Sequence, residues 1–183
     1  MVQVEVVRTI GCTPETYLEF VMDVERYREV DDKIGPIAWV RRQGNLTDLK
    51  YKPRLPGMSM PEPYTVARMR LTPGERVDIR LAPLPRNLTN RLVSKFAASF
   101  ACEPAAGGQT RVTRMVSFRF NPLVRWFFEP TLRRTLPGSV ERELRLAKEI
   151  LERAGHARDG RKHGEHSDQP MPGQAAGPGL GFR

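Results

Sequence analysis

The sequence predicts a domain of the α+β class, in which one long helix lies across an antiparallel sheet of seven strands. Two observations support this prediction. Residues 2–120 consist mainly of short runs in which apolar and polar residues alternate, the pattern of strands with one buried face. Between Val140 and Ala154, apolar residues instead recur at spacings of four and three, which places them on one buried face of a helix.

The chain of 183 residues is long enough for one domain of ordinary size followed by a tail. The composition changes after Ala154: residues 155–183 contain seven glycines and three prolines and almost no large apolar side chains. Such a segment cannot bury enough apolar surface to offset the entropy lost on ordering. We therefore expect a folded domain over residues 1–154 and a disordered tail over residues 155–183.

The first strand and the helices after it are predicted from local signals. Residues 2–10 alternate around Val2, Val4 and Val6. Thr13 and Pro14 follow, a helix-capping hydroxyl and a proline at the first helical position. The helical spacing then continues to about residue 28, with a break expected near Asp23 that divides it into two short helices.

Six further strands follow. We predict them at residues 34–42, 49–55, 64–71, 76–81, 92–103 and 110–120. Pro53 indicates an edge or the end of its strand. Residues 53–63 contain four prolines and two methionines around Gly57, which favours a loop at an opening, and a second loop is expected at residues 82–90.

The last predicted element is a helix within residues 121–154. Val140, Leu144, Ala147 and Leu151 form its apolar underside, and charged residues occupy the opposite side. Pro137 and Gly138 interrupt the pattern and predict a kink or a late helix start. A single helix across the sheet would share its underside with the sheet's inner face, which indicates a place to hold a ligand.

The charge and the termini narrow the function classes. The net charge of +9 divides into +8 for residues 1–154 and +1 for the tail, which has four basic and three acidic residues. A basic domain can approach nucleic acid or the surface of an anionic membrane, but no block of Lys and Arg exceeds two residues, so nucleic acid is the less favoured partner. No secretory signal or apolar span occurs, and we expect a cytoplasmic protein with Cys12 and Cys102 as free thiols.

Histidine chemistry is excluded from the predicted domain, because His156, His163 and His166 all lie in the tail. Without an imidazole, the domain lacks the usual general base, a histidine-based triad and an ordinary zinc site. No phosphate-binding glycine loop is present either. We therefore predict no metal and no cofactor, and any catalysis would depend on Arg, Tyr, carboxylates or water.

Two charged residues have unexpected positions. Arg114 shares the alternation of Val112 and Val116, the face predicted to be buried, where a charge needs a partner. Alternatively it extends from the rim of the sheet, or a bulge turns it outward. Glu143 lies within the apolar arc of the last helix, although an acid in the first helical turn would also be favoured there by the helix dipole.

The remaining candidates for ligand contact are mostly aromatic. Tyr51 and Tyr64 could hydrogen-bond a carbonyl or phenol oxygen, or simply pack within the strands. The apolar candidates are Trp39, Phe96, Phe100, Phe118 and, on the underside of the last helix, Ala147. They are ordinary core residues unless the sheet curves enough to leave a space.

The order of elements and the residues at both ends resemble a known family. The run from Ile10 to Glu15, and Asp23, Glu25 and Tyr27 after it, resemble the polyketide cyclase/dehydrase and lipid-transport branch of the START-like (SRPBCC) superfamily, and residues 132–152 are similar to its closing helix. The resemblance covers residues 2–154. It implies the helix-grip fold, in which a curved sheet and a long helix enclose a hydrophobic cavity, and it transfers no catalytic residues.

Two functions follow as hypotheses. The first is a carrier or chaperone that binds a lipid, an isoprenoid or quinone, or a polyketide-like molecule between the sheet and the last helix. The second is a polyketide cyclase or dehydrase, in which Arg114, a tyrosine and Glu143 position the substrate and stabilise an enolate. A nucleic-acid-binding or toxin-like role ranks last.

Overall fold

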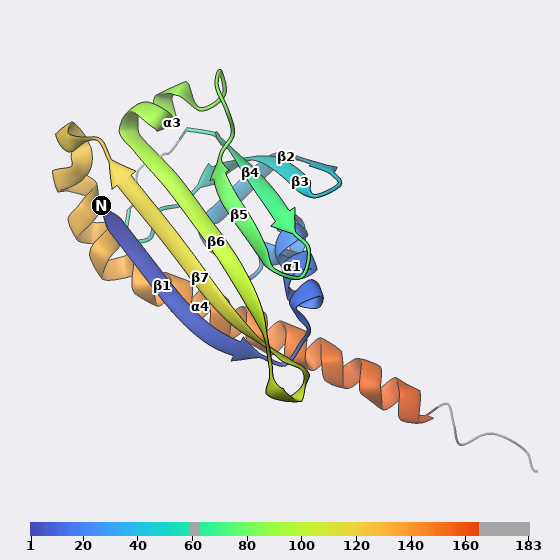
Figure 1. Cartoon of the computed structure of the whole chain (residues 1–183). Coiled ribbons are helices and arrows are strands. Elements are labelled where there is room, and N and C mark those ends of the chain that lie inside the picture. The colour runs from blue at the N-terminus through green and yellow to red at the C-terminus, as the bar shows by residue number, and fades with distance from the viewer. Residues whose placement is uncertain (59–62, 165–183) are drawn as a thin grey trace, which may run out of the picture.

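The alternating segments form one antiparallel sheet of seven strands in the computed structural model, which describes residues 1–58 and 63–164 and side chains as far as Gly155. The order across the sheet is β1-β7-β6-β5-β4-β3-β2 (Figure 1). The strands are β1 (Val2–Ile10), β2 (Ile34–Gln43), β3 (Leu46–Pro53), β4 (Thr65–Thr72), β5 (Arg76–Leu81), β6 (Ser94–Ala105) and β7 (Gln109–Phe120). The predicted α+β class and the seven strands are confirmed.

Two short helices connect β1 to β2. Helix α1 (Pro14–Met22) begins where the Thr13 hydroxyl accepts a hydrogen bond from the Thr16 amide, and α2 (Val24–Tyr27) follows after Asp23. The Asp23 carboxylate in turn accepts from the Arg26 amide, so this residue separates the helices by capping the second one. Both the predicted cap and the predicted break are present.

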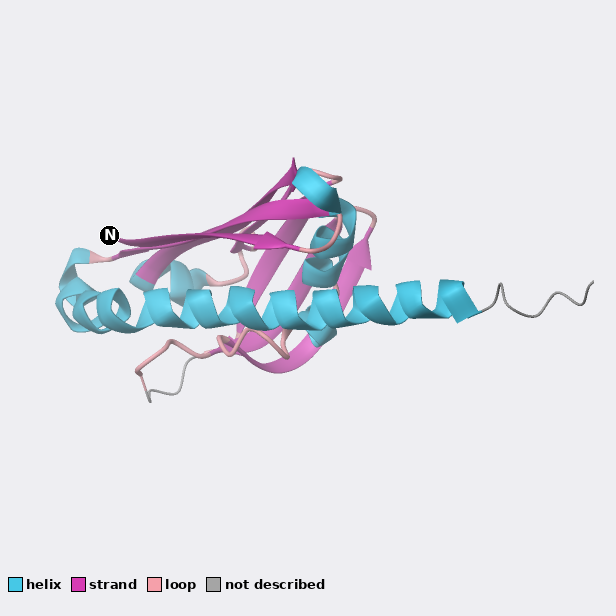
Figure 2. Ribbon diagram, turned by 90° about the horizontal axis from the view of Figure 1, so that it is seen from below, coloured by secondary structure: helices cyan, strands magenta, loops and turns pink. Residues whose placement is uncertain are grey.

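The long helix α4 (Pro122–Gly164) runs along the sheet beside β1 and β7, as Figures 1 and 2 show from two directions. Its buried residues divide the core into two parts. Leu144, Ala147 and Leu151 pack with α1, α2 and the central strands, whereas Leu132, Leu136 and Val140 pack on β1, β6 and β7. The apolar stripe predicted from the sequence is therefore the face that meets the sheet.

The course of α4 differs in two respects from the prediction. Its first turns lie at an angle to the long straight remainder (Figure 2). Pro130, early in the helix, removes a backbone hydrogen bond and so favours bending there. At Pro137, where the kink or late start was predicted, the helix continues. The helical backbone also continues past Ala154 to Gly164. Residues 165–183 lie outside the described residues, so the disordered tail stays a prediction.

A third short helix, α3 (Leu88–Val93), takes the last residues of the segment expected to be a loop and the first two residues of the strand predicted at 92–103, so β6 begins only at Ser94. A 3-10 turn, η1 (Ala106–Gly108), joins β6 to β7. Asn87, at a φ of 64°, starts α3 and fixes it to the sheet: its side chain accepts from the Val66 amide and donates to the Val66 and Ala82 carbonyls. Within the described ranges, no helix is both long and apolar enough to cross a membrane.

Candidate functional site

The concave side of the sheet encloses a cavity of about 310 Å³. Its walls are mainly apolar and come from the middle of the sheet, from the segment after α2, from α3 and from the loop after β3. The strand residues that line it include Leu49, Tyr51, Ala67, Met69, Ile79, Phe96, Arg114, Val116 and Phe118. This volume lies at the lower end of the range typical for small-molecule sites.

The long helix contributes less to this cavity than expected. Among the described residues of α4, Phe128 alone lines it, while the middle of the helix is buried against the core. Phe128 stacks on Phe120 with ring centroids 5.0 Å apart. The cavity therefore lies beside the helix, towards its beginning, and is closed largely by α3 and by residues 53–58.

A group of five side chains that we call the charge cluster lies at one end of the cavity: Tyr27, Asp31, Lys33 and Arg114 line it, and Glu143 is buried behind them. Glu143 is 1% exposed and Arg114 2% exposed. The Arg114 Nε donates to Glu143 Oε1 at 2.9 Å, and Lys33 Nζ lies 2.6 Å from Glu143 Oε2 and 2.7 Å from Asp31 Oδ1. The Tyr27 hydroxyl also donates to Glu143.

The cluster contains two cations and two carboxylates, so its net formal charge is zero. Burial opposes ionisation of Glu143, but Arg114 and Lys33 together hold the pKa of its carboxyl below the ordinary value. Asp31 differs, because burial and the neighbouring Glu143 raise the pKa of its carboxyl. Burial and the same Glu143 also raise the pKa of the Tyr27 phenol, so this group stays a hydrogen-bond donor.

Arg114 faces the cavity with donors to spare. Its Nε is engaged by Glu143, but Nη1 has the Met115 carbonyl only at 3.5 Å, and Nη2 lies 3.9 Å from Asp31 Oδ2. The guanidinium also sits 3.9 Å above the centre of the Phe100 ring, which fixes its plane. Because its charge is already balanced, the guanidinium suits an uncharged oxygen, such as a carbonyl, better than an anion.

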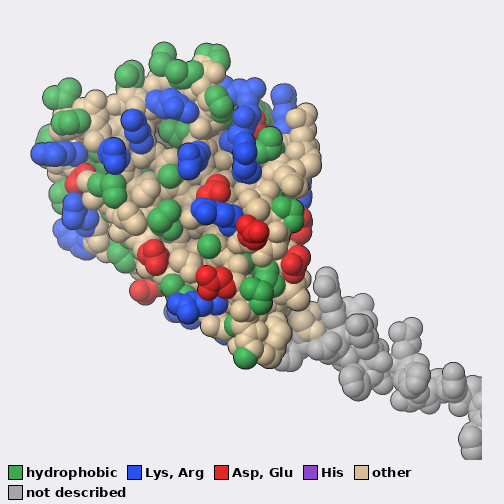
Figure 3. Space-filling model, viewed as in Figure 1, with side chains coloured by type: hydrophobic (Ala, Val, Ile, Leu, Met, Phe, Trp, Pro, Cys, Tyr) green, Lys and Arg blue, Asp and Glu red, His purple; other side chains and the backbone are tan. Residues whose placement is uncertain are grey.

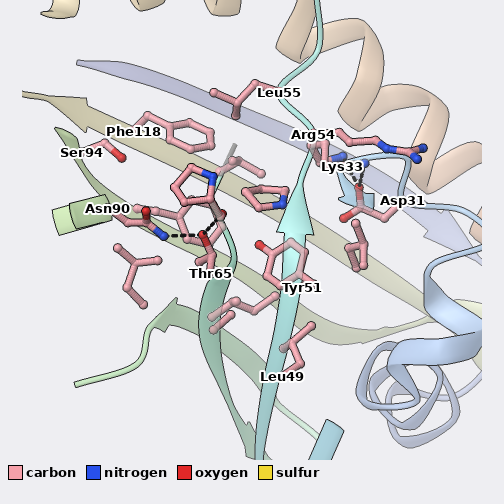
Figure 4. A pocket seen from close by; sticks show the side chains of 18 of the residues that line it. Asp31, Lys33, Leu49, Tyr51, Arg54, Leu55, Thr65, Asn90, Ser94 and Phe118 are labelled. Atoms are coloured by element: carbon pink, nitrogen blue, oxygen red, sulfur yellow. Dashed lines mark hydrogen bonds and ion pairs between the residues drawn. The ribbon is translucent and has the colours of Figure 1, made fainter. Parts of the chain in front are cut away.

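The other end of the cavity is polar without being charged. Asn90 of α3 donates to the Thr65 hydroxyl of β4, and Ser94 lies close by at the start of β6. Figure 4 shows this group and Phe118 on one side, Asp31 and Lys33 on the other, and Tyr51 between them. The cavity thus has polar groups at both ends and an apolar middle.

The loop after β3 packs directly on α4. Thr135 Oγ1 donates to the Pro56 carbonyl at 2.7 Å. Gly57 has a φ of 77°, and a Cβ added to it would meet Thr135 Cγ2 at 2.8 Å and Thr131 Cγ2 at 3.0 Å. Glycine is therefore required both by the backbone and by the close approach to the helix. Leu55 and Met58, on either side of this contact, line the cavity.

The structure divides the predicted site residues into three sets. Tyr51, Phe96, Arg114 and Phe118 line the cavity. Phe100, Glu143 and Ala147 are fully buried behind it, Glu143 as the partner of Arg114. Trp39 and Tyr64 lie away from it, under Arg41 and beside Lys50 and Lys52 respectively.

Arg114 and Glu143 show that the alternation and the helical arc located buried charges correctly. The interpretations in which Arg114 turns outward are wrong, because it lies in register between Val112 and Val116. Asp31, Lys33, Thr65 and Asn90 were not predicted as site residues. The sequence signal for the first two was slight: a short charged run directly after α2, which reads as a solvated turn.

A curved antiparallel sheet, a long helix along it and an internal apolar cavity together form the helix-grip fold that the sequence resemblance implies. Residues 1–152 match the family model described as polyketide cyclase / dehydrase and lipid transport, and the chain belongs to this family. The resemblance stated from the sequence is thereby confirmed. No curated protein matches the sequence.

Several solved structures share the fold. A protein from Thermus thermophilus superposes with a TM-score of 0.65 at 15% identity, covering 84% of this chain and 99% of that one. The Zhui aromatase/cyclase from Streptomyces sp. R1128 superposes with a TM-score of 0.63 at 13% identity, covering 84% of this chain and 98% of that one. A START superfamily protein from Mycobacterium smegmatis superposes with a TM-score of 0.54 at 14% identity, covering 81% of this chain and 98% of that one. At these identities the likeness establishes the fold alone.

Proposed function

We propose that this protein binds an uncharged, largely hydrophobic molecule with an oxygen at one end, and carries or shields it in the cytoplasm. The observation behind this proposal is the apolar cavity of about 310 Å³ that ends in a charge-balanced cluster. An anion would unbalance that cluster, whereas a carbonyl or phenol oxygen could accept from the Nη atoms of Arg114. Lipids, quinones and polyketides all include molecules of this kind.

The test is binding of a neutral apolar fluorophore, N-phenyl-1-naphthylamine, to the purified protein and to Ala67→Leu. Ala67 lines the cavity, so the larger side chain reduces the space and should weaken binding by roughly tenfold. Ala38→Leu, at an exposed position of β2, is the matched control and should bind like the wild type. The proposal fails if the probe does not bind, or if both variants bind it equally well while both remain folded.

A second function has one specific observation in its favour. Asp31 lines the cavity near Arg114, and its raised carboxyl pKa would make it a better proton acceptor than an ordinary aspartate. In a cyclase, Asp31 would remove a proton next to a substrate carbonyl while the Arg114 guanidinium stabilises the enolate oxygen.

This alternative predicts turnover of a poly-β-ketone substrate that is abolished in Asp31→Asn. Binding of N-phenyl-1-naphthylamine to the same variant should be retained, since Asn preserves the shape of the side chain. Binding without any turnover by the wild type would leave the carrier function and exclude the cyclase.

A further inference from the structure

One end of the molecule exposes an unusual number of large apolar side chains. Six of them, which we call the end surface, are 46% to 82% exposed: Leu84, Leu88, Leu92, Leu123, Trp126 and Phe127. They come from only two segments, the loop and helix around α3 and the first turns of α4. The most exposed are Leu123 at 82% and Trp126 at 74%. Exposed apolar groups gathered in this way mark an interaction site.

The two segments are joined to each other. The Asn121 amide donates to the Val93 carbonyl at 2.9 Å, and the Asn121 side chain donates to the Leu92 carbonyl at 3.3 Å. The beginning of α4 is therefore fixed beside the end of α3, and both lie at the same end of the molecule in Figure 1. On their inner sides the same segments line the cavity through Asn90, Val93 and Phe128.

The two segments that carry the end surface hold cations only, while Glu129 follows them directly and Asp48 of β3 pairs with Arg86 at 3.2 Å. Residues 84–95 and 119–128 contain Arg86, Arg91, Lys95, Arg119 and Arg125 but no Asp or Glu. Figure 3 shows hydrophobic and cationic side chains together over the upper part of the molecule, where α3 and the start of α4 lie, and most carboxylates of that face lower down. A second copy of this surface would repel the first, because cations would meet cations.

We propose that the end surface docks on an anionic lipid bilayer. Leu88, Leu123 and the neighbouring leucines would enter the boundary of the acyl chains, and Trp126 would lie at headgroup level, where tryptophan is enriched. The surrounding arginines and lysine would contact lipid phosphates. Docking would bring the cavity wall against the bilayer. This deepens the proposed carrier function, but it is tested without any cargo.

The experiment is co-sedimentation of the ligand-free protein with vesicles of phosphatidylcholine alone or mixed with phosphatidylglycerol. The wild type should bind the mixed vesicles, and high salt should weaken binding. Leu123→Ser/Trp126→Ser should bind on the order of tenfold more weakly, whereas Val7→Ser/Val40→Ser, at exposed apolar positions of β1 and β2, should bind normally.

The charge contribution has its own matched pair of variants. Lys95→Gln/Arg125→Gln, in the two segments that carry the end surface, should weaken binding by roughly tenfold. Arg142→Gln/Arg145→Gln removes the same charge from the exposed back of α4 and should have little effect. In a Trp39→Phe background Trp126 is the one remaining tryptophan, and its emission should shift to shorter wavelength on binding.

Absence of binding to the mixed vesicles overturns the proposal. So does an equal loss of vesicle binding in the end-surface variants and in their controls. Self-association abolished by Leu123→Ser/Trp126→Ser, without vesicle binding, would show that a second copy occupies the surface and would also overturn it. The proposed carrier function is judged separately, because probe binding in the cavity needs no vesicles.

Discussion

The Glu143 carboxylate is contacted by three side chains that come from three separate parts of the chain. Tyr27 belongs to α2, Lys33 directly precedes β2, and Arg114 belongs to β7. Such a buried cluster is stable only while its charges and hydrogen bonds are matched. Glu143 therefore fixes α4 in position relative to the segment after α2, and so shapes the charged end of the cavity.

Replacement of Glu143 by Gln should lower the free energy of unfolding by about 3 kcal/mol, because Arg114 and Lys33 would then share the single carboxylate of Asp31. Urea unfolding monitored by circular dichroism measures the change. Glu149→Gln, on the exposed side of the same helix, should change the value by no more than about 0.5 kcal/mol. Equal effects of the two substitutions would show that the cluster contributes nothing to stability.

The stability difference between the wild type and Glu143→Gln should depend on pH. The folded-state pKa of the Glu143 carboxyl lies below its ordinary value of 4.5, so its stabilising contribution is fully present above pH 4.5 and is lost as the pH falls through the folded pKa. The difference in unfolding free energy between wild type and Glu143→Gln should thus be constant near neutral pH and shrink in acid. A difference that grows towards acid would contradict the assignment.

At the scale of elements, the loop after β3 is held to α4 by a contact that only glycine permits. Gly57→Ala should destabilise the protein by about 2 kcal/mol or more, since it adds backbone strain and a clash with Thr135 Cγ2. Gly107→Ala is the control: its φ of 71° imposes similar strain, but the added Cβ meets nothing within 4 Å. It should cost about 1 kcal/mol.

Thr135→Ser removes the clashing methyl group and keeps the hydroxyl that bonds Pro56. Added to Gly57→Ala, it should restore part of the lost stability, measured as the free energy of unfolding. If it restores none, or if Gly57→Ala and Gly107→Ala cost the same, the loop is not packed on α4 as described.

Elements were predictable where periodicity decides their conformation, and contacts were not. The strands and the buried face of α4 follow from alternation and from spacings of three and four, so the burial of Arg114 and Glu143 could be recognised from the sequence alone. Asp31 and Lys33 could not. Their burial depends on packing against Glu143, which lies 110 residues beyond Lys33 in the chain. No local sequence pattern encodes such a contact. The small helix α3 was missed for a related reason, because Asn87 stabilises it through hydrogen bonds to β4.

At the scale of the whole molecule, the C-terminal part of α4 contacts the rest of the domain as far as Glu152. Its carboxylate accepts from the Gly11 amide at 2.8 Å and pairs with Lys148 at 3.0 Å, while Leu151 is buried in the core. Beyond these contacts the sequence offers little to bury.

We therefore expect a chain ending at Arg158 to keep the melting temperature within a few degrees of that of the full chain, and to bind the same probe. A chain ending at Leu146 loses Ala147 and Leu151 from the core and should fail to fold. Thermal unfolding and N-phenyl-1-naphthylamine binding measure both outcomes. A large drop in melting temperature on shortening the chain only to Arg158 would show that the last residues dock on the domain.

The pairing of the first strand with the last has a consequence for protein synthesis. Val2 of β1 lies opposite Phe118 of β7, so the N-terminal strand has no partner until nearly the whole sheet has left the ribosome. At about 5 to 20 residues per second, this wait is on the order of ten seconds, followed by the further time needed to make α4. Throughout it, the nascent chain exposes the apolar side of β1 and an unpaired strand edge to chaperones and to neighbouring chains.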